Sequence, residues 1–358
     1  MKIVIAVDKF AGTMTSQEAG EAIADGWLSV RKSDEVVVIP MADGGPGTVD
    51  ALASAGNAVR HTSTAVSQYG EEIEADWLVV DDSLAVIEAA SVCGLHLSER
   101  RSPLDGDTSG LGILLAAVAN FGITDVLIGL GGSGTVDGGV GMARALGANF
   151  GINDDSPQGP APRWLLDMTS TSPIPSIGLE RVRLASDVDS PLLGPRGAAS
   201  LFGPQKGATS SDIEVLEAGL RQIADVVERD LPGGPWRDAR GAGAAGGLGF
   251  GAMAWLGAEV VGGADLVADE IKLDAHLSDA DIVITGEGSA DASTLEGKVP
   301  VVVLRRATGR PVYLVAGRAT DEVGHHFNRY VELGERGLSA PHEEARRAGS
   351  SLADSTDS

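Results

Sequence analysis

Carboxylates and lysines follow several apolar runs of this chain, where they could support phosphoryl transfer. The carboxylates concerned are Asp43, Asp137, Asp187, Asp189, Glu287 and Asp291. Such groups can hold Mg²⁺ or accept a proton from a hydroxyl group. Lys206 and Lys298 could each pair with a phosphate or a carboxylate. Phosphoryl transfer needs mainly positioning, charge neutralisation and one base, so this set suits it, although any single acid could instead cap a helix.

A glycine-rich loop is the second candidate element for binding an anion. Residues 126–128 are predicted to form a buried strand, and glycine occupies four of the six positions 129–134. Apolar side chains return at helical spacing after Gly139. A strand, a glycine loop and a helix in this order can place an anion at the helix N-terminus. A tight turn with glycines for packing alone is the competing interpretation.

The elements that must position these residues are predicted to be strands beginning near residues 3, 36, 126, 282 and 312. In an open parallel sheet, the loops after the strands lie at one edge, where ligands bind. These loops contain, in chain order, Asp8-Lys9, Asp43-Gly44-Gly45, residues 129–134, Gly286-Glu287-Gly288 and Gly317-Arg318. The sequence therefore predicts a ligand site at this edge.

Helices and a hairpin complete the predicted architecture. Capping boxes at Thr15–Glu18 and Ser211–Glu214 predict the starts of two helices. Runs at 77–80 and 84–87 predict a hairpin, which a purely parallel sheet would not contain. We therefore expect an α/β chain with one domain over 1–58, 103–150 and 275–334. A second domain is expected over 59–102 and 151–274, and a polar tail over 335–358.

Composition excludes several classes of protein. The formal charge of −24 over 358 residues argues against nucleic acid or an anionic membrane surface as a partner. Cys93 is the only cysteine and lies in an apolar run, so we expect a buried structural thiol and a reducing compartment. No run is long enough for a membrane span or a signal-peptide core, so we expect a cytoplasmic protein.

Standard nucleotide motifs are missing, with one exception. Neither a Walker-type loop nor a protein-kinase catalytic loop occurs, and the histidines lack the spacing of a zinc site. Gly129-x-Gly131-x-x-Gly134 does match the dinucleotide fingerprint, with Asp154 and Asp155 about 20 residues further on. An NAD-dependent dehydrogenase is therefore the alternative enzyme.

Seven segments together resemble the bacterial glycerate kinase family of the type I, two-domain kind. They are residues 1–8, Ala42-Asp43-Gly44-Gly45-x-Gly47-Thr48, Gly129-x-Gly131-Gly132-Ser133-x-Thr135-x-Asp137-Gly138-Gly139, Ser186-Asp187-Val188 with Pro191-Leu192, residues 202–207, residues 241–247, and Ile284-Thr285-Gly286-Glu287-Gly288-x-x-Asp291 with Gly297-Lys298-x-Pro300. The resemblance implies a flavodoxin-like or Rossmann-like parallel-sheet domain, discontinuous in sequence, and a second mixed α/β domain. It also implies an active-site cleft between the two domains.

The resemblance further implies phosphorylation of D-glycerate by ATP with Mg²⁺, giving 2-phosphoglycerate or 3-phosphoglycerate. Asp187 would be the base, and Lys206, a second catalytic residue, would hold phosphate together with the loop 131–134. The remaining expected site residues are Asp8, Lys9, Asp43, Gly44, Gly45 and Asp137 for the substrate, Gly131, Gly132, Ser133, Gly134, Gly286, Glu287, Gly288 and Lys298 for phosphate or nucleotide, and Asp189 and Asp291 for the metal. The expected partners are the hydroxy acid and ATP, and a homodimer stays open.

Several positions depart from the pattern of that family. Its expected lysine, glutamate, asparagine, arginine and histidine are replaced, in that order, by Ala11, Pro46, Val136, Ser289 and Glu296. These losses favour, as a second hypothesis, a degenerate relative that binds nucleotide or a small acid without turnover.

Overall fold

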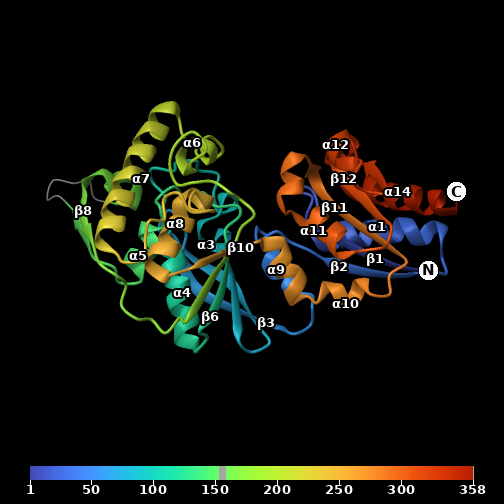
Figure 1. Cartoon of the computed structure of the whole chain (residues 1–358), viewed down its shortest axis with the longest axis horizontal. Helices are drawn as coiled ribbons and strands as arrows, with labels where there is room; N and C mark the ends of the chain where they lie inside the picture. Colours follow the sequence, from blue (N-terminus) through green and yellow to red (C-terminus); the bar gives the residue numbers. More distant parts are fainter. Residues whose placement is uncertain (153–158, 358) are drawn as a thin grey trace. The chain divides into compact units, whose positions relative to one another are not determined.

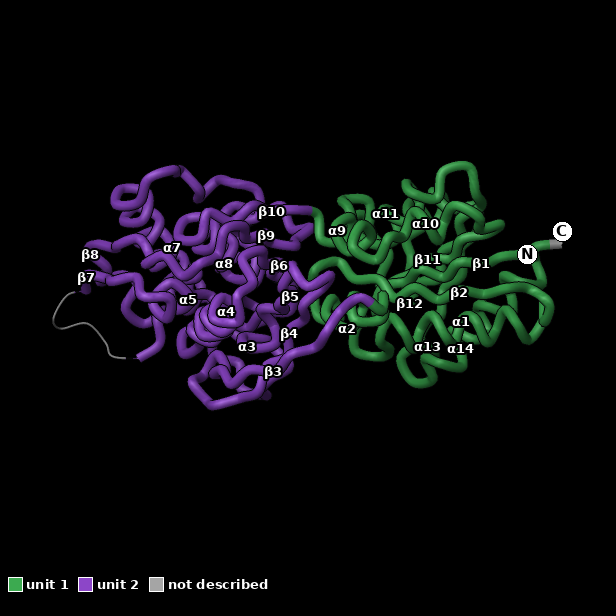
Figure 2. Tube along the Cα trace, turned by 90° about the horizontal axis from the view of Figure 1, so that it is seen from below, with its two compact units in different colours: residues 1–56, 262–358 green, residues 57–261 purple. Residues whose placement is uncertain are grey.

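The computed structural model describes residues 1–152 and 159–357, and the chain divides into two compact units. Unit 1 comprises Met1–Gly56 and Gly262–Ser358, and unit 2 comprises Asn57–Val261 (Figure 2). The chain therefore leaves unit 1 once and returns to it once. The prediction of a parallel-sheet domain that is discontinuous in sequence is confirmed.

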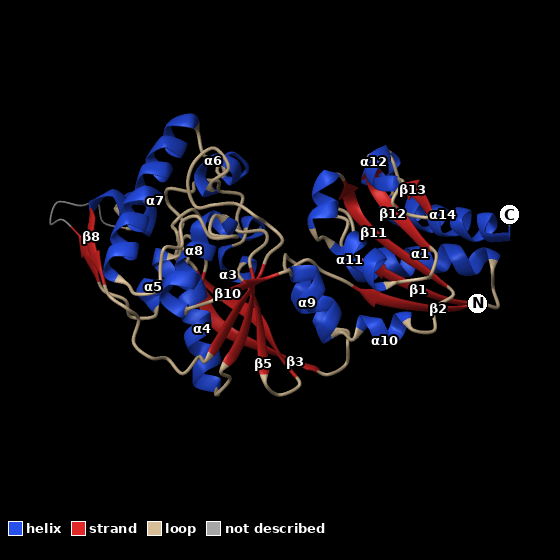
Figure 3. Ribbon diagram, in the orientation of Figure 1, coloured by secondary structure: helices blue, strands red, loops and turns tan. Residues whose placement is uncertain are grey.

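Unit 1 is built on a fully parallel sheet. Its elements are β1 (Lys2–Val7), α1 (Ser16–Val30), β2 (Glu35–Pro40), α2 (Thr48–Ala53), α9 (Gly263–Glu270), α10 (Leu273–Leu277), β11 (Ile282–Ala290), η5 (Ala292–Glu296), α11 (Val299–Arg306), β12 (Val312–Ala319), α12 (Asp321–Gly324), β13 (Arg329–Glu332), α13 (Arg336–Ser339), α14 (Pro341–Asp354) and η6 (Ser355–Asp357). The strand order is β13-β12-β11-β1-β2, and every neighbouring pair is parallel. Figure 3 shows these strands in red and the helices in blue.

Helices cover both faces of this sheet. On one face, Ile3 and Ile5 of β1 pack into a core with Trp27 of α1 and Leu352 of α14. On the other face, α11 contacts β11 and α2 contacts β2, while α9 contacts both helices. From β1 the chain passes through α1 to β2, toward one edge of the sheet, and from β11 it passes through α11 to β12, toward the opposite edge. The order in which strands are added therefore reverses between β1 and β11, although all strands stay parallel. Ligands of open α/β sheets bind at such a switch point.

Unit 2 combines parallel and antiparallel strands. Its elements are β3 (Ala58–Val66), β4 (Glu72–Val80), β5 (Leu84–Glu88), α3 (Ala90–Cys93), η1 (Leu95–Leu97), α4 (Ser109–Phe121), β6 (Asp125–Gly129), α5 (Val140–Ala145), β7 (Phe150–Ile152), η2 (Ala161–Arg163), η3 (Leu165–Asp167), β8 (Met168–Thr171), β9 (Arg181–Ala185), α6 (Ala198–Phe202), η4 (Pro204–Lys206), α7 (Ser210–Asp230), α8 (Ala244–Leu256) and β10 (Glu259–Val261). The main sheet has the order β10-β9-β6-β5-β4-β3. Strands β10, β9, β6 and β5 are parallel, and β4 and β3 continue the sheet as antiparallel neighbours. The predicted hairpin corresponds to β4 and β5.

The predicted domain boundaries require two corrections. Residues 103–150 belong to unit 2, because β6 pairs with β5 and β9 and not with any strand of unit 1. An apolar run predicts a buried strand but does not identify its neighbours. Residues 262–274 belong to unit 1, as part of the segment that returns to it.

The expected polar tail is also wrong, because residues 341–354 form α14, which packs along α1 (Figure 1). The approach of the two helices is close: a Cβ added at Gly26 would lie 1.9 Å from the carbonyl oxygen of Arg346. The apolar side of α14 is narrow and contains mostly alanine, which explains why the sequence pattern is weak.

Local sequence signals agree with most of the remaining elements. The Thr15–Glu18 capping box begins α1 as predicted, whereas α7 begins two residues earlier than predicted, at a box formed by Thr209 and Asp212. Cys93 is fully buried, and burial raises the pKa of its thiol to about 12, as expected for a structural cysteine. Within the described residues, no helix is both long and apolar enough to cross a membrane.

Candidate active site

The residues predicted to form the site fall into two groups, one in each unit. The unit 1 group consists of Asp8, Lys9, Asp43, Gly44, Gly45, Gly286, Glu287, Gly288, Asp291 and Lys298. The unit 2 group consists of Gly131, Gly132, Ser133, Gly134, Asp137, Asp187, Asp189 and Lys206. The expectation that all five loops lie on one sheet edge is therefore wrong for the loop after residue 129, because β6 belongs to the second sheet.

In unit 1, charged side chains meet at the switch point between β1 and β11. Asp8 follows β1, and its backbone N–H donates to the carbonyl of Gly286 at 2.9 Å. The Nζ atom of Lys9 lies 3.6 Å from Asp8 Oδ1 and 3.5 Å from Asp43 Oδ1. Asp43 also accepts a hydrogen bond from the N–H of Gly45 at 3.0 Å, which fixes the turn after β2. One ammonium thus bridges two carboxylates from neighbouring strand ends.

Burial changes the acidity of two carboxyl groups in this cluster. Desolvation raises the pKa of Asp8 to about 7, and the negative charge of Asp43 adds to the effect while Lys9 opposes it. Desolvation also raises the pKa of Glu287, opposed by hydrogen bonding from Thr294 and by the charge of Lys298. The Thr294 hydroxyl donates to Glu287 Oε1 at 2.5 Å, and Lys298 Nζ lies 3.7 Å from Oε2. Perturbed carboxyls at a ligand-binding edge are candidates for a functional site.

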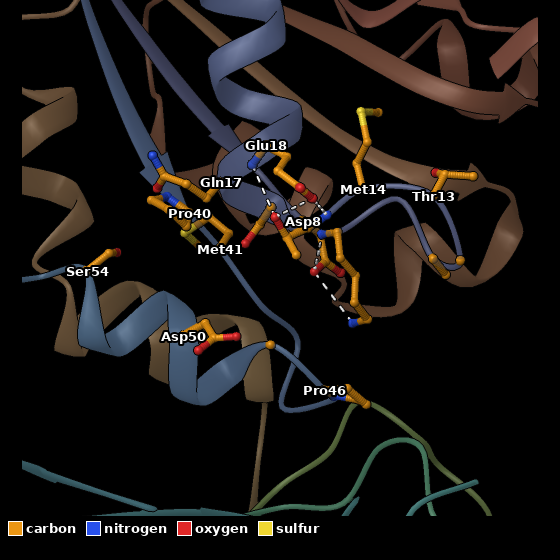
Figure 4. A pocket seen from close by; sticks show the side chains of 16 residues that line it. Asp8, Thr13, Met14, Gln17, Glu18, Pro40, Met41, Pro46, Asp50 and Ser54 are labelled. Carbon is orange, nitrogen blue, oxygen red and sulfur yellow. Dashed lines mark hydrogen bonds and ion pairs between the residues drawn. The ribbon is translucent and has the colours of Figure 1, made fainter. Parts of the chain in front are cut away.

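A pocket of about 650 Å³ lies beside this cluster within unit 1. Its walls come from the loop after β1, the start of α1, the end of β2 and the start of α2 (Figure 4). Met14, Pro40 and Met41 contribute apolar lining, and Asp8, Lys9, Glu18 and Asp50 contribute charged groups. A pocket of this size and mixed lining is typical of sites for ligands as large as a nucleotide.

Two of the predicted phosphate-binding glycines have a packing role in the structure. Gly286 and Gly288 lie within β11, which continues to Ala290, rather than in a loop after the strand. A Cβ at Gly286 would lie 2.2 Å from the carbonyl oxygen of Val315. Asp291 caps η5 by accepting from the N–H and hydroxyl of Ser293, at 2.9 and 2.5 Å. Close packing therefore accounts for the two glycines, and capping of η5 accounts for the aspartate at position 291.

In unit 2, two neighbouring strand ends bring the other predicted residues together. β6 and β9 are adjacent and parallel, with Gly129 opposite Ala185. The loops that follow them therefore leave the sheet side by side. Together with η4 and the start of α8 they enclose a cavity of about 220 Å³, lined by Leu130, Gly131, Gly132, Ser133, Ser186, Val188, Phe202, Gln205, Lys206, Ala244 and Ala245.

Lys206 is the cation of this cavity. Its side chain is buried, with the residue only 2% exposed. The Nζ atom donates to Ser133 Oγ at 3.0 Å and to the carbonyl oxygen of Thr135 at 2.7 Å. Desolvation lowers the pKa of Lys206 to about 8, opposed by the negative charge of Asp137. At neutral pH the ammonium form therefore dominates.

Asp187 and Asp189 occupy the loop after β9. Asp187 is half-buried and lies between Ser186 and Val188, which both line the cavity. Asp189 is exposed, and its backbone carbonyl accepts from Arg196 at 3.2 Å. Within the described residues, no group of three or more histidine, cysteine or carboxylate side chains could hold a metal ion.

Asp137 has a structural position that does not fit its predicted contact with a substrate. It is fully buried, and Oδ2 accepts from the N–H and hydroxyl of Thr108 and from the N–H of Gly141, at 2.8 to 2.9 Å. Its Oδ1 accepts from the N–H of Gly139 at 3.1 Å. The anion at the start of the helix after the glycine loop is thus the protein's own carboxylate, and the predicted phosphate position there is wrong.

The dinucleotide fingerprint does not have its usual geometry. β6 ends at Gly129 and α5 begins only at Val140, so a ten-residue loop replaces the tight strand-to-helix turn. Asp154 and Asp155 lie outside the described residues.

A left-handed turn at the start of α8 is a feature of the cavity that sequence reasoning missed. Ala245, Gly246 and Gly247 have φ values of 52°, 73° and 86°. A Cβ at Gly246 would lie 1.9 Å from the carbonyl oxygen of Thr135, the same oxygen that accepts from Lys206. The glycine- and alanine-rich composition of this segment was the available signal, because only such residues permit both the conformation and the approach.

The positions that depart from the glycerate kinase pattern have different surroundings. Ala11 and Pro46 line the 650 Å³ pocket, whereas Val136 lies fully buried in the core of unit 2. Ser289 and Glu296 are exposed. Only the first two therefore alter the lining of a pocket in the described structure.

Comparisons with known proteins agree over nearly the whole chain. The model of the glycerate kinase family matches residues 3–348. A glycerate kinase of Bacillus subtilis (strain 168) is 40% identical over 328 residues, which cover 88% of this chain and 85% of the relative. A glycerate 2-kinase of Escherichia coli (strain K12) is 38% identical over 332 residues, which cover 90% of this chain and 87% of the relative.

A solved structure extends the agreement to three dimensions. A crystal structure assigned as glycerate kinase 2 from Salmonella typhimurium LT2 matches with a TM-score of 0.83 at 34% sequence identity. The match covers 100% of this chain and 98% of that structure. These similarities and the loop geometry after β6 together set aside the dehydrogenase alternative.

Proposed function

The chain belongs to the glycerate kinase family, and from this premise we propose that it phosphorylates D-glycerate with ATP. The proposed product is 2-phosphoglycerate, with 3-phosphoglycerate as the alternative. The acceptor is an alcohol group, and the reaction needs a base, a charged cradle for the transferring phosphate and Mg²⁺. The single observation that carries the proposal is the position of Asp187 between two residues that line a cavity with a buried lysine.

Asp187 is the proposed base. Its carboxylate accepts the proton of the attacking hydroxyl, the hydroxyl oxygen bonds to the γ-phosphorus, and the bond from that phosphorus to the bridging oxygen breaks. ADP leaves with the electron pair of the broken bond. The half-buried position of Asp187 supports this role, because Oδ2 is shielded from water while the residue as a whole is not fully enclosed.

Each unit has its own proposed anion-binding cations and loops. Lys9 and Lys298 are the proposed phosphate ligands of unit 1, beside the 650 Å³ pocket for the nucleoside. Lys206 and residues 131–134 hold an anionic group in unit 2. Glu287, Asp43, Gly44 and Gly45 complete the unit 1 edge.

Mg²⁺ is proposed to enter with the nucleotide. Magnesium usually retains several waters and binds one or two carboxylates in addition to phosphate oxygens. Asp291 has one oxygen committed to capping η5, and Asp189 is exposed, so each fits the role of a single carboxylate ligand. The ion would neutralise charge that develops on the phosphate oxygens.

The proposal is tested by incubating the full chain with Mg·ATP and D-glycerate and identifying the product by phosphorus NMR. We expect one phosphoglycerate isomer and equimolar ADP. Asp187→Asn should lower kcat at least 100-fold with an unchanged unfolding temperature. The matched control is Glu214→Gln, an exposed acid on α7, which should retain full activity.

A second candidate function is binding without turnover. It is favoured by Ala11 and Pro46, which line the pocket where a lysine and a glutamate are expected from the family pattern. Calorimetric binding of ADP and D-glycerate together with the absence of any phosphoglycerate would support this candidate and overturn the kinase proposal.

A further inference from the structure

We propose that the unit 2 cavity binds the carboxylate of the hydroxy-acid substrate on Lys206, so that this lysine selects the substrate and does not hold nucleotide phosphate. The inference rests on the proposed function and names the substrate group that one of its sites recognises. It revises the expectation from the family resemblance, which assigns Lys206 to phosphate.

The first argument is that Lys206 is a buried cation whose neutralising partner is missing. An ammonium group has three N–H donors, and the structure uses two of them, on the neutral oxygens of Ser133 and Thr135. Among the described residues, no carboxylate forms an ion pair with this Nζ atom. Burying an ammonium without an opposite charge is costly, so such a group at a cavity wall indicates an anionic ligand.

The second argument is the size and charge of the cavity. Its volume of about 220 Å³ suits a small organic acid and is well below the usual range for drug-sized or nucleotide ligands. Lys206 is the only cation among the residues that line it, so the cavity matches a single negative charge. In unit 1, by contrast, Lys9 lines a pocket of about 650 Å³, whose volume is a better match for a nucleoside with its phosphates.

The third argument is the arrangement of neutral polar groups. Ser133, Ser186 and Gln205 line the same cavity, and they can donate to or accept from hydroxyl groups of a polyol acid. Asp187 directly follows Ser186 in the chain. A carboxylate anchored on Lys206 would therefore place a substrate hydroxyl toward the loop that carries the proposed base.

Calorimetry on the full chain tests the inference, with D-glycerate and ADP as separate probes. Lys206→Met should raise the dissociation constant for D-glycerate about 10- to 100-fold, as expected for one lost charge-assisted hydrogen bond. The affinity for ADP should stay within about twofold. Lys9→Met is the matched control and should show the reverse pattern.

Selectivity supplies a readout that a merely structural lysine would not change. Glycerol lacks the carboxylate, so the ratio of kcat/KM for D-glycerate to that for glycerol should fall at least tenfold in Lys206→Met. Should this variant unfold, Ser133→Ala removes one of the hydrogen bonds that position Nζ and should weaken D-glycerate binding by a smaller factor, with ADP affinity retained.

The outcomes separate this inference from the proposed function. A wild-type chain that binds and phosphorylates D-glycerate, but whose Lys206→Met variant loses affinity for ADP and keeps it for D-glycerate, overturns the inference alone. An unchanged selectivity ratio has the same meaning. A wild-type chain that binds no D-glycerate overturns both.

Discussion

The carboxylate of Asp137 accepts hydrogen bonds from both the backbone N–H and the hydroxyl of Thr108, at 2.9 and 2.8 Å. The two residues are 29 positions apart in sequence. Thr108 is the N-cap of α4, and Asp137 also binds the first turn of α5, so one buried carboxylate joins the starts of two helices. The loop that carries Ser133 and Thr135 is therefore fixed at its far end by an internal charge.

Replacement of Asp137 is expected to destabilise unit 2. In Asp137→Asn the amide NH₂ would face backbone donors, and the start of both helices would lose a charged acceptor. We expect the free energy of unfolding to fall by about 3 kcal/mol or more, the cost typical of breaking a buried charged network. Urea unfolding followed by tryptophan fluorescence measures it, since four of the five tryptophans lie in unit 2.

The matched control for this variant is Asp189→Asn in the exposed part of the loop after β9. Its free energy of unfolding should stay within about 0.5 kcal/mol of the wild-type value. Equal effects of the two substitutions would contradict a structural role for Asp137.

A comparison of Gly246 with Gly257 distinguishes the cost of a left-handed backbone conformation from the cost of a steric clash. Gly246 and Gly257 have similar left-handed conformations, with φ values of 73° and 63°. A Cβ at Gly246 would lie 1.9 Å from the Thr135 carbonyl oxygen, whereas nothing lies within 4 Å of one at Gly257. Gly257→Ala should therefore cost about 1 kcal/mol, the penalty for a left-handed residue with a side chain, and Gly246→Ala several times more.

The affinity for D-glycerate should also differ between the two glycine variants. Because the Thr135 carbonyl is one of the acceptors of Lys206, Gly246→Ala is also expected to weaken binding in the unit 2 cavity. Thermal unfolding and D-glycerate calorimetry measure the two effects. If Gly257→Ala lowered the stability and the D-glycerate affinity as much as Gly246→Ala, the left-handed conformation alone would explain both effects.

Much of the fold could be predicted from local patterns. The apolar runs identified β1, β2, β6, β11 and β12, and the Thr15–Glu18 box marked the first residue of α1. Sheet membership could not be predicted in this way, because the strand propensity of β6 is the same whether it pairs with β1 or with β5 and β9. Because β6 was assigned to the wrong sheet, the loop after residue 129 was predicted at the edge of the unit 1 sheet, whereas it lies in unit 2.

For the site residues too, the sequence predicted some features and could not predict others. Loops after strands were correctly expected to carry Asp8, Asp43 and Asp187, since strand ends are readable from the sequence. The difference between Asp137 and Asp187 was not readable, because a carboxylate that caps helices internally and one in a loop beside a cavity have the same residue type. Only the partners of each oxygen distinguish them.

The stability contributed by Asp8 should depend on pH. Its pKa is raised to about 7 in the folded chain from the ordinary value of 3.8, so between these pH values the folded state holds a proton that the unfolded state has released. Stability from this group therefore falls as the pH rises from about 4 to 7 and then levels off. Asp8→Asn removes this dependence, so its stability relative to wild type should rise by about 2–3 kcal/mol between pH 5 and pH 8.

Parallel urea titrations of the two proteins at pH 5, 6, 7 and 8 measure this difference. The difference in the free energy of unfolding at pH 5 is subtracted from the others, so that any pH-independent effect of the substitution on packing cancels. A difference that stays constant across the range would mean that the Asp8 carboxyl ionises normally in the folded chain.

Binding of D-glycerate should weaken at alkaline pH because of Lys206. Burial lowers the pKa of its ammonium to about 8, so the free protein loses this positive charge as the pH rises through that value. If only the charged form binds the carboxylate, the dissociation constant should be constant below about pH 7 and rise about tenfold per pH unit above pH 8. Calorimetry between pH 6.5 and 9.5 measures the profile, and Lys206→Met should give weak binding with no such rise. A wild-type profile that stays flat to pH 9.5 would contradict a carboxylate contact made by this lysine.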